Sequence, residues 1–259
     1  MWHDFIYHIL LLRDFIAVLF MSIAGVWDWR KREIDPRLWI APIVIGIVVN
    51  TYRALYFGIS GLDVLSVMLE LLFLVVIGLL VFCLRVLGGA DLLALATLVA
   101  LYPFPPIPYY ASSISLLRYA SLLPPLLEIL TYYSFAMIIL LVYNVLSNLR
   151  RLRMLKRIDI PLRRKVLYLI SARILTLDEF MSKRFYFPVY VPGVINRKSF
   201  NVYEDDREWR ERLRGLNADY LVIACWGIPT VSFIAVSLLI YLLLRFSPLA
   251  LLLSLVVKW

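Results

Sequence analysis

The sequence is poor in residues that could build a metal centre or a redox site. Its 259 residues include two cysteines, Cys83 and Cys225, and two histidines, His3 and His8. The cysteines form no C-x-x-C pair, and both histidines lie near the N-terminus, so no group of residues has the spacing of metal ligands. We therefore expect the cysteines to be buried and inert, and we expect no metal and no cofactor.

Charged residues are also scarce. They make up 17% of the chain, whereas 63% of it is hydrophobic. A soluble domain normally contains about 25% charged and about 45–50% apolar residues. Because the apolar residues gather in long runs, a single soluble core could not absorb them. The composition predicts an all-α polytopic membrane helical bundle.

The apolar runs predict about six transmembrane helices, with five or seven as alternatives, because a span needs about 20 residues. The fourth segment begins at Asp91 and has only eleven residues, Leu92 to Tyr102, before Pro103 to Pro108 stops any helix. We expect it to be tilted, half-inserted, or continued by the irregular stretch to Pro125. The other expected spans run from about Phe5 to Trp27, Leu38 to Tyr56, Val64 to Leu87, Leu126 to Leu146 and Tyr220 to Leu244, with Leu249 to Val257 as an interfacial tail.

The basic residues are distributed unevenly. Seventeen of the 27 Lys and Arg residues lie between Arg150 and Arg214, and five more follow the first span or precede the fourth. This bias predicts that residues 149–218 form a basic cytoplasmic segment between a membrane domain (1–148) and a final span with its tail (219–259). We expect a multi-pass plasma membrane protein whose basic surface meets anionic lipids rather than nucleic acid.

Two aspartates border apolar segments, and the predicted topology brings both to the cytoplasmic face. Asp28 follows Gly25-Val26-Trp27, and Asp91 follows Gly88-Gly89-Ala90. A carboxylate beside lipid is costly, so such a residue is a functional candidate by default. Two of them on one face predict a shared acid–base site.

Two carboxyl groups that approach closely cannot both ionise cheaply, so one keeps a proton while the other acts as a base. Such a pair can activate water and protonate a carbonyl or a leaving amine. Helix polarity favours Asp91, at the start of a helix, as the base, and Asp28, near the end of another, as the proton carrier. Glycines beside Asp91 would let an extended peptide approach the acid.

Each aspartate also has a purely structural interpretation. Asp28 could be an interfacial residue paired with Arg30 or Arg32, and Asp91 could simply cap a helix. The two together, on one membrane face, favour a functional site more strongly than either does alone.

The two motifs resemble those of the type IV prepilin peptidase family, and most closely its archaeal preflagellin/prepilin branch. Asp28 is followed by a basic cluster, and Gly88-Gly89-Ala90-Asp91 resembles the G-x-hydrophobic-D form of the second motif. The resemblance implies a membrane aspartyl endopeptidase with Asp28 and Asp91 as catalytic residues and with Gly88, Gly89 and Ala90 supporting the motif. It also implies, as substrates, precursor proteins with class III (pilin-like) signal peptides, cut at the cytoplasmic membrane face. Because the C-x-x-C motifs of bacterial members are missing, N-methylation is not implied.

A basic leader peptide would need acidic contacts on the enzyme. The candidates are Glu33, Asp35, Asp178, Glu179, Glu204, Asp205, Asp206 and Glu208. A solvated charged loop is the more ordinary interpretation of the run from Glu204 to Glu208. Glu70, inside the third span, is expected to be buried and protonated or paired with Arg13, in a structural role.

Three other functions fit parts of the sequence. A small transporter or channel would use broken spans and charge at mid-depth, which Glu70 and the proline-rich stretch offer in part. A non-enzymatic membrane scaffold would bind partners through residues 149–218. A presenilin-type protease shares a glycine–aspartate motif, but its Pro-Ala-Leu motif is missing from this sequence.

Overall fold

The computed structural model describes residues 2–84, 88–105, 124–156, 158–201, 203–244 and 247–248, with the side chains of residues 2–5, 7, 80, 82 and 84 left aside. The chain forms two compact units. The first combines Met1–Phe135 with Pro229–Trp259, and the second is Ala136–Ile228. One long helix, α6, contributes its beginning to the first unit and its end to the second.

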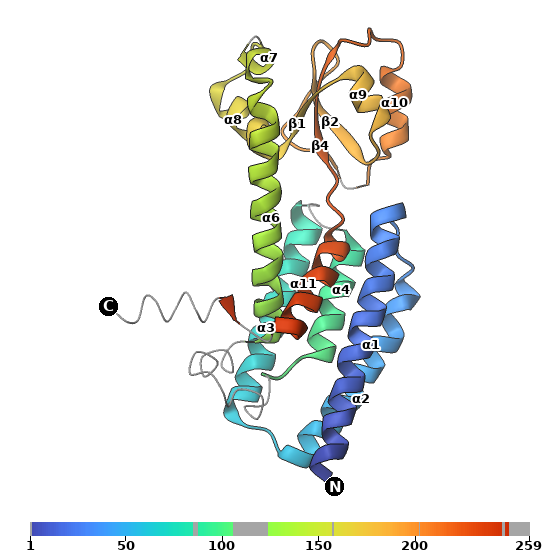
Figure 1. Ribbon diagram of the computed structural model, residues 1–259, viewed down its shortest axis with the longest axis vertical. Coiled ribbons are helices and arrows are strands. Elements are labelled where there is room, and N and C mark those ends of the chain that lie inside the picture. The colour runs from blue at the N-terminus through green and yellow to red at the C-terminus, as the bar shows by residue number, and fades with distance from the viewer. Residues whose placement is uncertain are drawn as a thin grey trace, which may run out of the picture. The chain divides into compact units, whose positions relative to one another are not determined.

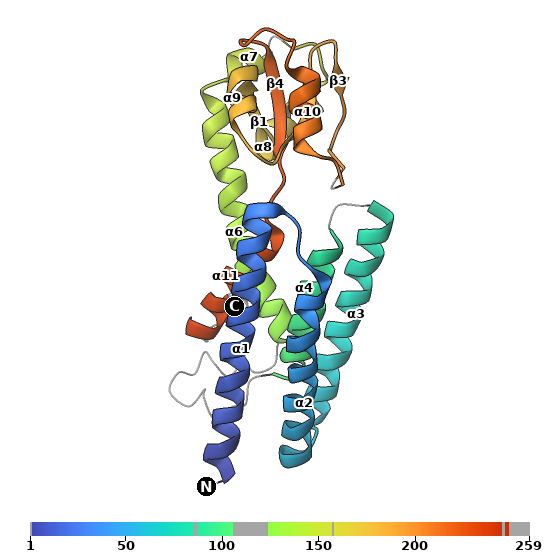
Figure 2. The same cartoon turned by 90° about the vertical axis from the view of Figure 1, so that its right-hand side faces the viewer.

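The first unit is a bundle of apolar helices (Figures 1 and 2). Four stretches in the described part of the chain are long and apolar enough to cross a membrane: His8–Lys31, Pro36–Phe57, Gly61–Leu79 and Pro125–Leu149. The prediction of a mostly helical, multi-pass membrane protein is therefore confirmed. The helices are α1 (Trp2–Lys31), η1 (Pro36–Trp39), α2 (Ile40–Phe57), α3 (Gly61–Leu84), α4 (Gly89–Leu101), α6 (Pro125–Leu149) and α11 (Thr230–Leu244).

Helix α4 has 13 residues, and other helices surround it. It contacts α1, α2, α3 and α11, and Ala94, Thr97 and Leu98 are fully buried. The amide nitrogen of Asn50 in α2 donates to the carbonyls of Ala100 (2.9 Å) and Leu101 (3.0 Å) at the end of α4. Irregular backbone at membrane depth is tolerated where protein groups satisfy its polar atoms, so α4 can end without spanning the bilayer.

The second unit contains a small antiparallel sheet, which the all-α prediction does not include. The strands are β1 (Arg173–Thr176), β2 (Tyr186–Val191), β3 (Ile195–Asn196) and β4 (Leu221–Trp226), in the order β1-β4-β2-β3. A register shift between Pro188 and Tyr190 of β2 accommodates a proline in an interior strand, because Pro cannot donate to the ladder. The helices of this unit are α7 (Leu152–Lys156), α8 (Leu162–Ser171), α9 (Leu177–Ser182) and α10 (Asp206–Leu213).

Both faces of this sheet are covered. Along β4, Ile223 and Cys225 belong to one apolar core, and Val222 and Ala224 belong to another. The first core includes Tyr168 of α8, whereas the second includes residues of α9 and α10. Strand β4 is apolar at nearly every position because alternate side chains enter opposite cores.

The predicted sixth span, from about Tyr220 to Leu244, is therefore wrong in its first half. Residues Leu221–Trp226 are strand β4, and the helix that follows begins at Thr230 and has 15 residues. A strand buried on both faces gives the same continuous apolar signal as part of a membrane helix. The predicted tail, Leu249 to Val257, lies outside the described residues.

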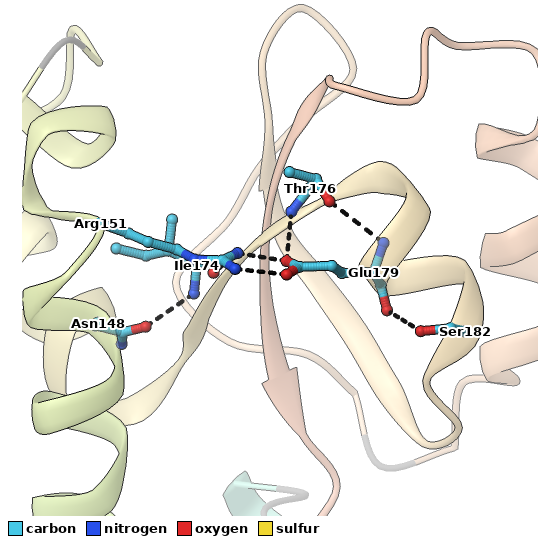
Figure 3. Close-up of polar contacts among 6 residues, drawn as sticks. All are labelled: Asn148, Arg151, Ile174, Thr176, Glu179 and Ser182. Carbon is cyan, nitrogen blue, oxygen red and sulfur yellow. Dashed lines mark hydrogen bonds and ion pairs between the residues drawn. The ribbon is translucent and has the colours of Figure 1, made fainter.

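The edge of the sheet at β1 is closed by side chains from the end of α6 and the turn after it (Figure 3). Asn148 Oδ1 accepts a hydrogen bond from the N–H of Ile174 (3.0 Å), and Arg151 donates to the carbonyl of Ile174 (2.8 Å). Arg151 also forms a two-pronged ion pair with Glu179, whose carboxylate accepts from the N–H of Thr176 (3.1 Å). The end of α6 is thereby fixed to the sheet of the second unit.

Candidate active site

Asp28 lies near the C-terminal end of α1, where its side chain meets the start of α11. The residue is 8% exposed. Its Oδ2 accepts hydrogen bonds from the N–H groups of Val231 (2.9 Å) and Ser232 (3.3 Å). The first N–H groups of a helix have no partner within the helix. The carboxylate of Asp28 supplies that partner and so caps the start of α11.

Gly25 allows α11 to approach α1 at this point. A Cβ at this position would lie 3.2 Å from Cα of Ser232 and 3.3 Å from Cβ of Ala235. The hydroxyl of Ser232 also donates to the carbonyl of Gly25 (2.6 Å). Small residues permit such close contact between membrane helices. The contact lies at Gly25, about one helical turn before Asp28, and holds the start of α11 against α1.

Asp91 is the third residue of α4, and its side chain turns back to the start of its own helix. Its Oδ2 accepts from the N–H of Gly88 (2.9 Å), and the residue is half-buried. Gly88 has an extended backbone, with φ −84° and ψ 162°, which any residue can adopt. Gly89 is exposed, and a Cβ added there would meet nothing within 4 Å. Open space therefore adjoins Gly89, two residues before Asp91.

The two aspartates, 63 positions apart in the sequence, belong to helices that touch. Helices α1 and α4 contact each other, and α11 contacts both. The charge of Asp28 acts on the carboxyl group of Asp91. Both carboxyl groups also act on the phenol of Tyr133 in α6, which interacts with the side chain of Thr230. The fold thus brings the two predicted site residues into one neighbourhood.

Helix polarity does not distinguish the two acids in the way the sequence suggests. Asp28 lies at the C-terminal end of its own helix, but it receives N–H groups from the first turn of α11. Asp91 receives an N–H group at the start of α4. Both carboxyl groups therefore lie at a helix N-terminus, and the argument that made Asp91 the base loses its basis.

Most of the acids considered for a basic leader have partners inside the second unit. Glu179 pairs with Arg151, Glu204 with Arg197, Asp206 with Arg210 and Glu208 with Arg212. The side chain of Asp205 caps α10 by accepting from Arg207 N–H (2.8 Å). These contacts favour the ordinary structural interpretation of the run from Glu204 to Glu208. Of the remaining candidates, Asp35 caps η1 through the N–H of Arg37 (2.9 Å), and Glu33 and Asp178 are exposed.

Glu70 is buried, at 1% exposure, but it does not pair with Arg13. Its Oε1 accepts from the N–H of Leu126 (3.0 Å) at the beginning of α6. Arg13 instead pairs with its neighbour Asp14 (2.9 Å) and lies over the ring of Tyr102. The expected structural role of Glu70 is supported, and of its two alternatives the pair with Arg13 is not formed.

Three neighbours of the carboxyl pair could not be identified from the motifs. They are Val231 and Ser232, which donate to Asp28, and Tyr133. The sequence Gly227-Ile228-Pro229-Thr230 contains a helix-start signal, which could have located the beginning of α11. Within the described residues, no group of three or more His, Cys, Asp and Glu side chains is arranged to hold a metal ion.

Comparison with known proteins identifies a family whose sequence pattern this chain matches. The sequence pattern of the type IV leader peptidase family matches residues 15–143, a segment that contains both Asp28 and Asp91. Over this segment, just under half of the chain, the sequence is similar to that family. The resemblance predicted from the two motifs is thereby confirmed, and the matched segment ends within α6.

A curated relative extends the family comparison. The chain is 32% identical over 136 residues to the preflagellin peptidase of Methanococcus voltae. The match covers 52% of this chain and 57% of the relative, so the chain spans little more than half of that relative's length.

Proposed function

We propose that this chain is a membrane aspartyl endopeptidase that removes short basic leader peptides from pilin-like or archaellin precursors. Asp28 and Asp91 are its catalytic residues. The observation that carries the proposal is that these two acids lie on contacting helices, α1 and α4, and that the charge of Asp28 acts on the carboxyl group of Asp91. The similarity of residues 15–143 to the type IV leader peptidase family supports the same reaction class.

The chemistry follows from two carboxyl groups that hold one proton between them. The ionised group takes a proton from water, and the resulting hydroxide attacks the carbonyl carbon of the scissile peptide bond. The protonated group donates its proton to the carbonyl oxygen. The tetrahedral intermediate then collapses: the amide nitrogen receives a proton from the first carboxyl group, one hydroxyl of the intermediate returns its proton to the second carboxylate, and the C–N bond breaks. The pair ends with one proton, as it began.

The site is proposed to face the cytoplasm. The basic residues after Asp28 and the 17 in residues 150–214 favour that side for the ends of the helices that carry the acids. A precursor whose apolar segment lies in the bilayer would then present the adjoining leader to Asp28 and Asp91. The missing side chains of Gly88 and Gly89 would let its backbone approach Asp91, and the space beside Gly89 is open.

Cleavage of a defined precursor tests the proposal. The purified chain in lipid nanodiscs is incubated with a synthetic precursor that carries a basic leader before an apolar helix, and mass spectrometry identifies the products. The wild type is expected to cut once, between leader and apolar helix, and Asp91→Asn is expected to lose at least about 10³-fold in rate. A transporter or a scaffold would give no cleavage at all.

Asp63→Asn is a matched control. Asp63, in α3, is 8% exposed, as Asp28 is. It pairs with Arg53 (3.2 Å), which lies near the C-terminal end of α2. The control therefore removes an equally buried carboxylate that takes no part in the proposed reaction. It should still cleave the precursor, and loss of cleavage in Asp63→Asn would show that the assay reports folding rather than catalysis.

A further inference from the structure

Arg32 has a backbone conformation that is unusual for an arginine. Helix α1 ends at Lys31, and Arg32 follows with φ +61°. This left-handed conformation is unfavourable for a residue with a Cβ, and Gly or Asn usually occupies such a position after a helix. A costly conformation in a bulky residue is a reason to ask what its side chain does.

The turn keeps Arg32 beside Asp28. Its N–H donates to the carbonyl of Asp28 (3.1 Å), one helical turn earlier. Arg32 is half-buried, and its Nε and Nη1 atoms are shielded from solvent. The other basic residues of this cluster, Arg30 and Lys31, are exposed. Arg32 thus carries its charge into the protein, whereas its neighbours carry theirs into solvent.

The guanidinium acts on both acids. The charge of Arg32 interacts with the carboxyl group of Asp28 and with that of Asp91. Of the elements packed around the pair, α6 contributes the phenol of Tyr133, and α11 contributes uncharged N–H groups. Arg85 lies outside the described residues. Arg32 is therefore a cation that acts on both carboxyl groups.

We propose that Arg32 is a positioning residue for the carboxyl pair, whose guanidinium supplies the fixed positive charge that lets Asp28 and Asp91 occupy one site. Two carboxylates repel each other, and a nearby cation offsets that repulsion. The charge also sets the pH range in which the pair holds a single proton. The use of that proton in peptide cleavage rests on the proposed function, whereas the charge relationship itself does not.

Titration of the aspartates tests the proposal without needing catalysis. The chain is labelled with ¹³C at its aspartate carboxyl carbons, placed in nanodiscs and titrated by NMR, with Asp28→Asn and Asp91→Asn used to assign the two signals. Arg32→Asn removes the charge but suits the left-handed conformation. It should move the titration midpoints of the pair to higher pH by about one unit, and Arg32→Lys should restore most of that shift.

Arg30→Asn is the matched control, because it removes the same charge from an exposed position two residues away. It should leave the midpoints unchanged. Unchanged midpoints in Arg32→Asn would overturn the proposal, and so would an equal shift in Arg30→Asn, which would reveal only a general surface charge. If Arg32→Asn unfolds, Arg32→Gly, which fits the same turn, replaces it with the same expectation.

The cleavage assay separates this proposal from the proposed function. A wild type that leaves the precursor intact would contradict the peptidase function, yet the titration would still decide the role of Arg32. In a wild type that cleaves, Arg32→Asn should move the pH–rate profile by the same amount as the midpoints. A variant that merely disturbed the end of α1 would lower the rate at every pH without moving the profile.

Discussion

Oδ2 of Asp28 lies 2.9 Å from the backbone nitrogen of Val231, a residue 203 positions later in the chain. This hydrogen bond joins the first membrane helix to the last described one. Asp28 therefore has a structural partner as well as a proposed catalytic role. Any test of its chemistry must separate the two.

Substitution of Asp28 should distinguish these roles. Asn keeps an oxygen that can accept from Val231, whereas Ala leaves the first N–H groups of α11 without a partner, at a cost of about 1–3 kcal/mol. We expect both variants to lose cleavage and only Asp28→Ala to unfold at a clearly lower temperature. Thermal unfolding in detergent, measured beside the cleavage rate, checks this. Equal unfolding temperatures for the two variants would mean that the hydrogen bond to α11 contributes little.

The contact between α2 and α4 should be intolerant of added volume. A Cβ at Gly46 would lie 2.5 Å from the carbonyl oxygen of Ala100, so the two backbones would have to separate. Gly46→Ala should destabilise the first unit by about 1–3 kcal/mol and disturb the helix that carries Asp91. Gly61→Ala, at a position with nothing within 4 Å, is the control. A Gly46→Ala protein as stable as the Gly61→Ala one would refute the close contact.

The ion pair in Figure 3 should make the second unit sensitive to acid. Arg151 lowers the pKa of Glu179 from 4.5 to about 2. The pair therefore contributes stability above about pH 4.5, and this contribution is lost as the pH falls toward 2. Because the Glu179 side chain is 38% exposed, we expect the contribution to be no more than about 1 kcal/mol.

Glu179→Gln tests this pair. It should lower the stability of β1 and α9 at pH 6 and have little further effect near pH 2.5. Hydrogen exchange of the amides in β1 and α9, corrected for the intrinsic rate at each pH, measures the stability at both pH values. A variant that loses the same stability at both pH values would show that charge is not what Glu179 contributes.

Cys225 should report on the unfolding of the second unit. Burial raises the pKa of its thiol to about 11, so little thiolate is present near pH 7.5 and the sulfur is shielded from reagents. Cys83 is exposed, so the expectation that both cysteines are buried is wrong for it. In a Cys83→Ser background, N-ethylmaleimide should react with the native protein far more slowly than with the denatured one. Rapid labelling of the native chain would contradict the burial of β4.

The pattern of the sequence was sufficient for some features and not for others. Long apolar runs located α1, α2, α3 and α6, because a membrane helix needs only local hydrophobicity. The same signal failed at Leu221–Trp226, where apolarity arises from burial on both faces of a sheet. Hydropathy alone could not separate this strand from the helix that follows it.

The candidate site divides in a similar way. Asp28 and Asp91 could be identified because each is a costly acid in a recognisable local motif. Their surroundings could not be predicted, because Val231, Ser232 and Tyr133 reach them only through tertiary packing. The helix-polarity argument failed for that reason: it used the helix to which Asp28 belongs and could not include α11, which Asp28 caps.

The pH dependence of cleavage should reflect a pair that shares one proton. The rate should rise with pH as the base ionises and fall again as the second proton is lost, which gives a bell-shaped profile. The two apparent pKa values of this profile belong to the pair rather than to either residue. Initial rates for the wild-type chain between pH 4 and pH 9 check this, and a profile with a single ionisation would argue against two carboxyl groups acting together.

The central claim is that Asp28 and Asp91 act as one catalytic unit, and the cleavage rates of Asp28→Asn, Asp91→Asn and the double variant test it most directly. Residues that act as a unit are strongly non-additive, because removal of either one abolishes the step that needs both. We predict that each single variant, folded as shown by its unfolding temperature, falls to the same residual rate as the double variant. A single variant that still cleaves, or a double variant slower than both by the product of their separate losses, would contradict the claim.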